Sequence, residues 1–323
     1  MVSSETVRVT ASVGRAQPVT PPAPISYVPQ WPATTVEVGD RSFNVRFNEP
    51  AGTHTEPVLF IHGLGGSSTN WTELMGLLSD RVQGIAPDLS GHGRSAPAPD
   101  NDYDVATHAR YMKNIAEQWF DGRPFHVVGN SLGGATSVQL AARYPEVVRS
   151  VTLVSPALPD LKPRLTNIHM PVMAIPGFGE NLTKLFLTRS AESRARANLQ
   201  QVFADPSRCH PQRLADNIAE AKERDELDYG VDAVMRSLRG LAKTYFDRSD
   251  EQPWLLAERI HAPVLAIYGK NDRLVMSKTA HKANRVFDDV RVLVIPNCGH
   301  VAQMEHPDVV AKAWRQMVDA HFS

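Results

Sequence analysis

The chain has 323 residues, of which 42% are hydrophobic and 21% are charged, so it can bury a large core and is long for one compact domain. Its formal net charge of −1 gives no indication of a nucleic-acid or membrane-surface partner. No stretch approaches the roughly 20 apolar residues of a transmembrane helix. Two cysteines, Cys209 and Cys298, are too few for a disulfide framework and fit a reducing compartment, so we expect a cytoplasmic protein.

Residues 1–34 form a proline-rich arm with six prolines and only three charged residues. The arm lacks the apolar run of a signal peptide. Such a composition predicts an extended or disordered segment, above all over residues 1–24. Docking of the end of the arm is the alternative, because Tyr27 and Trp31 offer apolar surface that could pack on the core.

Residues 35–157 are predicted to form the first part of an α/β core. Alternation over residues 35–47, interrupted by Gly39 and Asp40, predicts two paired strands joined by a turn. Strand and helix patterns then alternate up to about Ser155. This order favours a mostly parallel central sheet with helices on both faces.

The pentapeptide Gly129-Asn130-Ser131-Leu132-Gly133 is the most informative motif of the chain. It follows a short apolar segment, residues 125–128, that predicts a buried strand, and it precedes apolar residues at helical spacing. A serine on such a sharp strand-to-helix turn is held in a strained conformation with its hydroxyl exposed. Flanking glycines are required because a Cβ there would clash with the neighbouring strand and helix. Ser131 is therefore the candidate nucleophile.

Residues 158–253 differ in character from the segments on either side. Helical patterns occur without a convincing strand between them, over residues 181–187, 194–203, 211–224 and 231–246. We expect one helical insertion between two core strands that lie next to each other in the sheet. Such insertions commonly form lids that control substrate entry and exclude water.

Residues 254–323 are predicted to complete the core, and they supply two partners for Ser131. A buried strand over residues 263–269 is followed by Asp272, and a second strand over residues 290–295 is followed by His300. The carboxyl ends of parallel strands share one edge of the sheet, where ligand crevices lie. A serine nucleophile requires a histidine base, and that histidine requires a carboxylate. Asp160 is a weaker candidate for the acid.

The order Ser131, Asp272, His300 and three further segments resemble the α/β-hydrolases, and within them the capped serine hydrolases and carboxylesterases. These segments are HGLGG at 62–66, DLSGHGRS at 88–95 and HVAQMEHP at 300–307. The resemblance implies an oxyanion hole made by the backbone N–H groups of Leu64 and Leu132. It also implies that His62 braces its loop, and Asp88 and His92 are expected to hold turns together.

One position separates the chemistries within the family. Related dehalogenases and epoxide hydrolases use an aspartate at this turn, whereas an alkoxide at Ser131 suits attack on an acyl carbon. The resemblance therefore implies a serine hydrolase that cleaves a carboxylic ester of a small to medium, apolar substrate. Carbon–carbon bond hydrolases and cofactor-free perhydrolases use the same triad and stay open as alternatives, as does a ligand receptor on a hydrolase scaffold. No metal-ligand spacing or phosphate-binding loop occurs, so no cofactor or metal is implied.

Overall fold

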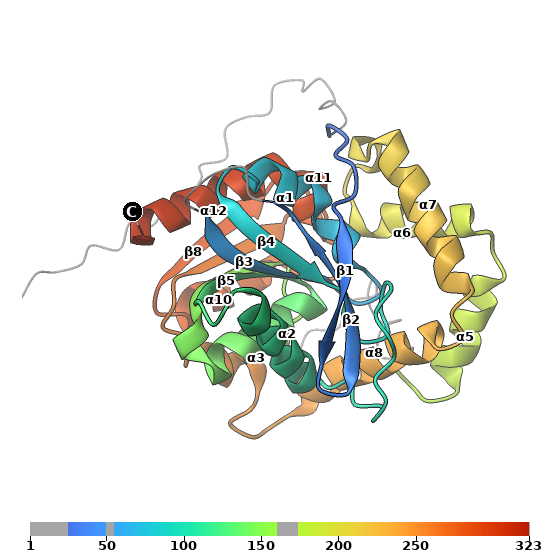
Figure 1. Cartoon of the computed structure of the whole chain (residues 1–323), viewed down its shortest axis with the longest axis horizontal. Helices are drawn as coiled ribbons and strands as arrows, with labels where there is room; N and C mark the ends of the chain where they lie inside the picture. The colour runs from blue at the N-terminus through green and yellow to red at the C-terminus, as the bar shows by residue number, and fades with distance from the viewer. Residues whose placement is uncertain (1–24, 50–54, 160–173, 323) are drawn as a thin grey trace, which may run out of the picture.

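A computed structural model describes residues 25–49, 55–159 and 174–322 of the chain (Figure 1). These residues form one eight-stranded sheet with the order β1-β2-β4-β3-β5-β6-β7-β8. All neighbours from β4 to β8 pair in parallel, and β2 is antiparallel to both β1 and β4. The strands are β1 Ala33–Val38, β2 Arg41–Phe47, β3 Glu56–Ile61, β4 Val82–Pro87, β5 Phe125–Asn130, β6 Val148–Val154, β7 Val264–Gly269 and β8 Val290–Ile295. The expected mostly parallel sheet is confirmed.

Helices cover both faces of the sheet because successive residues of its central strands point to opposite sides. Leu59 and Ile61 of β3 belong to one buried cluster, and Val58 and Phe60 belong to the other. The first cluster includes side chains from α2 Val105–Trp119, α3 Leu132–Arg143, α9 Pro253–Ala257 and α10 Ala280–Val286. The second includes side chains from α1 Thr72–Leu78, α11 Ala302–Glu305 and α12 Pro307–Phe322. Burial on both faces explains why these strands are continuous apolar runs.

The helical insertion follows β6 and precedes β7, which are hydrogen-bonded neighbours, as expected from the sequence. We call residues 174–246 the cap. It contains α5 Phe178–Leu187, α6 Ala191–Val202, α7 Pro211–Asp225 and α8 Gly230–Phe246. Figure 1 shows α5, α6 and α7 on one side of the molecule, to the right of β1 and β2 in this view. Residues 160–173 of the expected insertion, including Asp160, lie outside the described residues.

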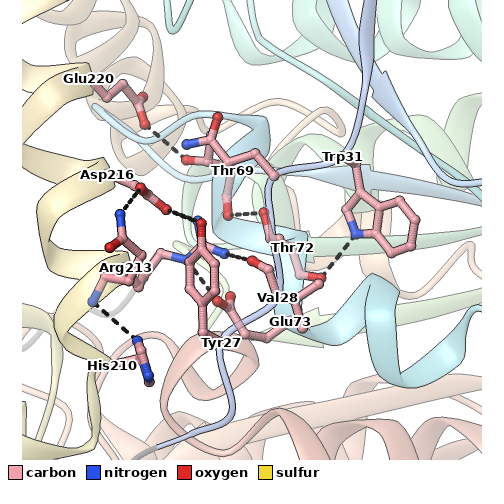
Figure 2. Close-up of polar contacts among 12 residues, drawn as sticks. Tyr27, Val28, Trp31, Thr69, Thr72, Glu73, His210, Arg213, Asp216 and Glu220 are labelled. Carbon is pink, nitrogen blue, oxygen red and sulfur yellow. Dashed lines mark hydrogen bonds and ion pairs between the residues drawn. The ribbon is translucent and has the colours of Figure 1, made fainter.

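The described end of the N-terminal arm is docked between the core and the cap (Figure 2). The indole N–H of Trp31 donates to the carbonyl of Thr72 at 3.1 Å, and the hydroxyl of Tyr27 donates to Asp216 of α7 at 3.2 Å. The alternative of a docked arm is thus confirmed for residues 25–32. The disorder expected over residues 1–24 lies outside the described residues. Among the described residues, no helix combines the length and apolar character needed to cross a bilayer.

Arg213 of α7 holds the arm, the core and the cap together. Its buried guanidinium donates to Glu73 of α1 at 2.7 Å, to Asp216 at 3.0 Å and to the carbonyl of Val28 in the arm at 2.6 Å (Figure 2). Glu73 is also buried, so both charges of this ion pair are removed from water. Breaking one side of a buried pair is costly because the other charge is left without compensation.

We predict that Arg213→Met lowers the free energy of unfolding by about 3–5 kcal/mol, because it leaves the carboxylate of Glu73 buried and unpaired. Urea denaturation at pH 7 measures the change. The matched control is Arg236→Met in α8, which removes an ion pair with Asp232 whose side chains are 41% and 49% exposed. That variant should lose no more than about 0.5 kcal/mol. Equal losses in the two variants would show that Arg213 does not join the three segments energetically.

Three histidines of the core are buried without a carboxylate partner in the described residues. Burial lowers the pKa of His62 to about 4, and burial together with neighbouring positive charge lowers the pKa of His92 and of His108 to about 3. All three are therefore neutral in the folded chain at pH 5 to 7. In the unfolded chain each has the ordinary pKa near 6.5.

Stability should therefore fall as the pH falls from about 6.5 towards 4. In that range the unfolded chain binds about three protons that the folded chain does not, so the unfolding free energy should change by up to about 4 kcal/mol per pH unit. Denaturant titrations at several pH values measure this slope, and His92→Asn should reduce it by about a third. A stability that stays constant between pH 6.5 and 5 would refute the assignment of neutral buried rings.

Candidate active site

Ser131 stands between β5 and α3 in a strained backbone conformation. Its φ of 55° and ψ of −115° lie in a region that residues other than glycine rarely adopt. The turn is sharp because the flanking glycines allow close approach of the backbone. A Cβ at Gly133 would lie 2.0 Å from the carbonyl oxygen of Ile61, and a Cβ at Gly129 would lie 2.3 Å from that of Gly133. The strained strand-to-helix turn expected from the pentapeptide is present.

Asp272 and His300 form a buried hydrogen-bonded pair at the same edge of the sheet. Nδ1 of His300 donates to Oδ2 of Asp272 at 2.9 Å, which leaves Nε2 as the basic nitrogen of the ring. Oδ1 of Asp272 accepts from the backbone N–H groups of Leu274 and Val275. Burial alone would raise the pKa of Asp272, but the charge of His300 and these hydrogen bonds outweigh burial and lower it. The carboxylate therefore stays ionised near neutral pH.

Backbone and amide contacts bring the three loops together around Ser131. The side-chain amide of Asn130, directly before Ser131, donates to the carbonyl of His300 at 3.1 Å. A Cβ at Gly63 would lie 3.1 Å from Cβ of Ser131, so the loop after β3 runs directly beside the candidate nucleophile. Leu64 follows Gly63 in that loop, and Leu132 begins α3, where the first N–H groups have no partner within the helix.

His62 braces the loop that contains Leu64. Leu89 donates its N–H to Nε2 of His62 at 2.9 Å, and Nδ1 lies 2.7 Å from the carbonyl of Gly63. Because Nε2 accepts a hydrogen bond, Nδ1 must carry the ring proton, and both nitrogens are occupied. His62 thus supports the loop structurally, as expected.

Asp88 organises the turn after β4. Its carboxylate accepts from the backbone of Ser68 at 2.6 Å, the amide of Asn44 at 2.8 Å and the backbone of Arg94 at 3.0 Å. Nδ1 of His92 lies 3.0 Å from the carbonyl of Ser90 within the same turn. Both residues hold the turn together, in agreement with the expectation from the sequence.

The cap contacts both loops beside Ser131, a feature that the sequence did not reveal. The N–H of His300 donates to the carbonyl of Val202 at the end of α6, at 2.7 Å. Arg224 of α7 donates to the carbonyl of Gly65 at 2.6 Å. Glu305 is the glutamate of the segment HVAQMEHP at 300–307. It is fully buried beside the loop that bears His300, which we call the histidine loop. In the sequence, only the resemblance of residues 300–307 to the α/β-hydrolases pointed to the region around His300. No sequence pattern identified the residues of the cap that contact it.

Two other polar features contain none of Ser131, Asp272 and His300. A cavity of about 590 Å³ is lined by Ser67, Thr69, Arg46 and α7 residues such as Glu220, but by neither Ser131 nor His300. Cys298, Glu305 and His306 lie close enough together to hold a metal ion. Burial strongly raises the pKa of the Cys298 thiol, and backbone N–H groups bind both oxygens of Glu305. Hydrogen bonding therefore accounts for this cluster.

Several characterised proteins are similar to this chain in sequence. The 2-(acetamidomethylene)succinate hydrolase of Mesorhizobium japonicum is 30% identical over 88% of this chain and 94% of that protein. The 2-hydroxy-6-oxo-6-(2'-aminophenyl)hexa-2,4-dienoic acid hydrolase of Metapseudomonas resinovorans is 26% identical over 86% and 91%. The dihydrolipoyllysine-residue acetyltransferase component of the acetoin cleaving system of Cupriavidus necator is 29% identical over 79% of this chain, and the match spans only 61% of that protein.

Solved structures agree on the fold. A membrane phospholipase A, described as a bacterial virulence factor, superposes with a TM-score of 0.72 at 23% identity, covering 90% of this chain and 86% of that one. A thermophilic esterase from Thermogutta terrifontis superposes with a TM-score of 0.69 at 19% identity, covering 90% and 100%. Residues 56–307 match the sequence profile of the α/β hydrolase fold. The chain therefore belongs to the α/β-hydrolase fold family and is an α/β-fold hydrolase.

Proposed function

We propose that the protein is a serine hydrolase that cleaves carboxylic esters through an acyl-enzyme, with Ser131, His300 and Asp272 as its triad. The observation that carries this proposal is the strained serine between β5 and α3, at the sheet edge that also holds a buried His300–Asp272 pair. A serine hydroxyl becomes an effective nucleophile only beside such a base.

In the proposed reaction, Nε2 of His300 takes the proton from Ser131 as its oxygen attacks the ester carbonyl. The N–H groups of Leu64 and Leu132 stabilise the oxyanion, and each such donor contributes about 2.7–4 kcal/mol to transition-state stabilisation. His300 then gives the proton to the leaving alcohol and activates water for deacylation. Asp272 keeps Nδ1 of His300 protonated and stabilises the imidazolium.

We further propose that residues 158–253 act as a lid that sets the size of the acyl pocket, between core segments 35–157 and 254–323. The relatives also support a second candidate, a carbon–carbon bond hydrolase, because the Metapseudomonas resinovorans relative hydrolyses a hydroxy-oxo-dienoic acid by name. Carbon–carbon bond hydrolases resemble one another in an H-G-x-G-P-G pattern in this first loop. The loop of this chain, HGLGG at 62–66, lacks the proline, which favours ester hydrolysis over carbon–carbon bond cleavage.

A substrate panel separates these two candidates. It compares p-nitrophenyl esters of increasing acyl length with a 2-hydroxy-6-oxo-hexa-2,4-dienoate, whose conjugated chromophore disappears on cleavage. We expect multiple turnovers on short and medium esters and much slower loss of the dienoate. Faster turnover of the dienoate would replace the ester assignment with the carbon–carbon one. A single turnover on every substrate would support a receptor.

Ser131→Ala should abolish ester hydrolysis and covalent labelling by a fluorophosphonate, because it removes the proposed nucleophile. Only residual catalysis from the oxyanion hole and substrate binding should persist. The variant should unfold with the cooperativity of the parent chain, since alanine requires no more space at this position. Unchanged turnover in this variant would overturn the proposed mechanism.

Asp272→Asn should lower kcat by about 10⁴-fold, because an asparagine amide favours the wrong histidine tautomer. The expected loss is in kcat, with KM much less affected. Steady-state kinetics on the preferred ester measure both constants. The matched control is Asp288→Asn, which replaces an exposed carboxylate 3.2 Å from His261 on the surface. Equal activity of the two variants would assign the acid to another residue, such as Asp160.

A further inference from the structure

Glu305 is a fully buried carboxylate that the proposed reaction does not use. It ends α11, and it accepts from backbone N–H groups of the nearby loop before α11 and of a distant segment of the cap. Oε2 accepts from Gly299 at 2.6 Å and from Ala204 at 3.1 Å, and Oε1 accepts from Asp205 at 2.7 Å. Gly299 directly precedes His300, whereas Ala204 and Asp205 follow α6 in the cap. One carboxylate therefore joins the histidine loop to the cap.

Two further hydrogen bonds join the histidine loop and α11 to the cap. The N–H of His300 donates to the carbonyl of Val202 at 2.7 Å, and Nε of the buried Arg208 donates to the carbonyl of Glu305 at 2.7 Å. The packing leaves no spare room, since a Cβ at Gly299 would lie 2.3 Å from the carbonyl oxygen of Val202. A displacement of the cap at residues 202–205 would therefore displace the backbone that bears His300.

We propose that Glu305 is a positioning residue that fixes His300 by tying its loop to the cap, so that the cap completes the catalytic geometry. This inference rests on the proposed role of His300. Hydrogen bonds to an ionised acceptor are roughly twice as strong as neutral ones. Oε2 is shared by the histidine loop and the cap, which makes the position of one segment depend on the other.

The proposal is tested with Glu305→Gln and Glu305→Ala. The glutamine oxygen can still accept from Gly299 and Ala204, but its NH₂ group then faces the N–H of Asp205. The alanine variant removes both acceptor oxygens and with them all three hydrogen bonds. We expect kcat and the fluorophosphonate labelling rate to fall by about 10- to 100-fold in the alanine variant, because a shift of about 1 Å in a reacting group can cost a factor of about 100. The glutamine variant should fall less, and KM should change little in either.

The matched control is Glu73→Gln, which alters another buried carboxylate that joins the core to the cap through Arg213. It should lower thermal stability without slowing labelling at temperatures where all variants are folded. If the Glu305 variants also lose only stability and keep their labelling rate, Glu305 is a structural contact and the proposal is wrong. If the alanine variant does not fold, the comparison of Glu305→Gln with Glu73→Gln decides.

A measurement without turnover separates this inference from the proposed function. The Nδ1 proton of His300, bound to Asp272, gives a low-field ¹H NMR signal that His300→Gln identifies by its loss. In Glu305→Gln this signal should shift or broaden, and in Glu73→Gln it should not. An unshifted signal contradicts the positioning role even if the chain hydrolyses esters. A shifted signal in a chain that hydrolyses no ester leaves the positioning role intact and refutes the ester function alone.

Discussion

The Ser131 edge depends on main chains that approach more closely than a side chain would permit. A Cβ at Gly133 would lie 2.0 Å from the carbonyl oxygen of Ile61, which brings α3 against the end of β3. A Cβ at Gly269 would lie 1.9 Å from the carbonyl oxygen of Gly299, which brings β7 against the histidine loop. These contacts set how far apart the ends of the parallel strands can stand. The strained backbone of Ser131 is tolerated because the packed strand and helix on either side define it.

The cap also contacts the loops at the Ser131 edge of the sheet. An insertion that begins and ends at neighbouring strands, as the sequence predicts for residues 158–253, can be independent of the core. The contact of Val202 with His300 and that of Arg224 with Gly65 argue against such independence. The cap supplies hydrogen-bond partners to both loops that stand beside Ser131. Because the carbonyl of Val202 accepts from the N–H of His300, the position of the cap and that of the loop bearing the proposed base are linked.

Sequence patterns predicted the parts of the structure that depend on local order. Apolar runs located the strands, helical spacing located α5 to α8, and the glycines around Ser131 predicted a tight turn. Contacts between distant segments left no such trace. Glu73 and Arg213 are 140 residues apart, and Glu305 lies 101 residues from Ala204, so neither pattern nor spacing could pair them. The composition of the arm likewise gave no position for Tyr27, because docking depends on the surface that receives it.

The histidines illustrate why residue type alone does not identify a base. His62 directly precedes the glycine that lies beside the proposed nucleophile, yet backbone groups occupy both of its ring nitrogens, and burial lowers its pKa to about 4. His300 is buried as well, but its Nδ1 is bound to the carboxylate of Asp272. That carboxylate offsets the cost of a positive charge in the interior, which backbone carbonyls and amides around His62 do not. In the proposed mechanism His300 takes up a proton during the reaction, and the buried carboxylate of Asp272 is the partner that would stabilise the charged ring.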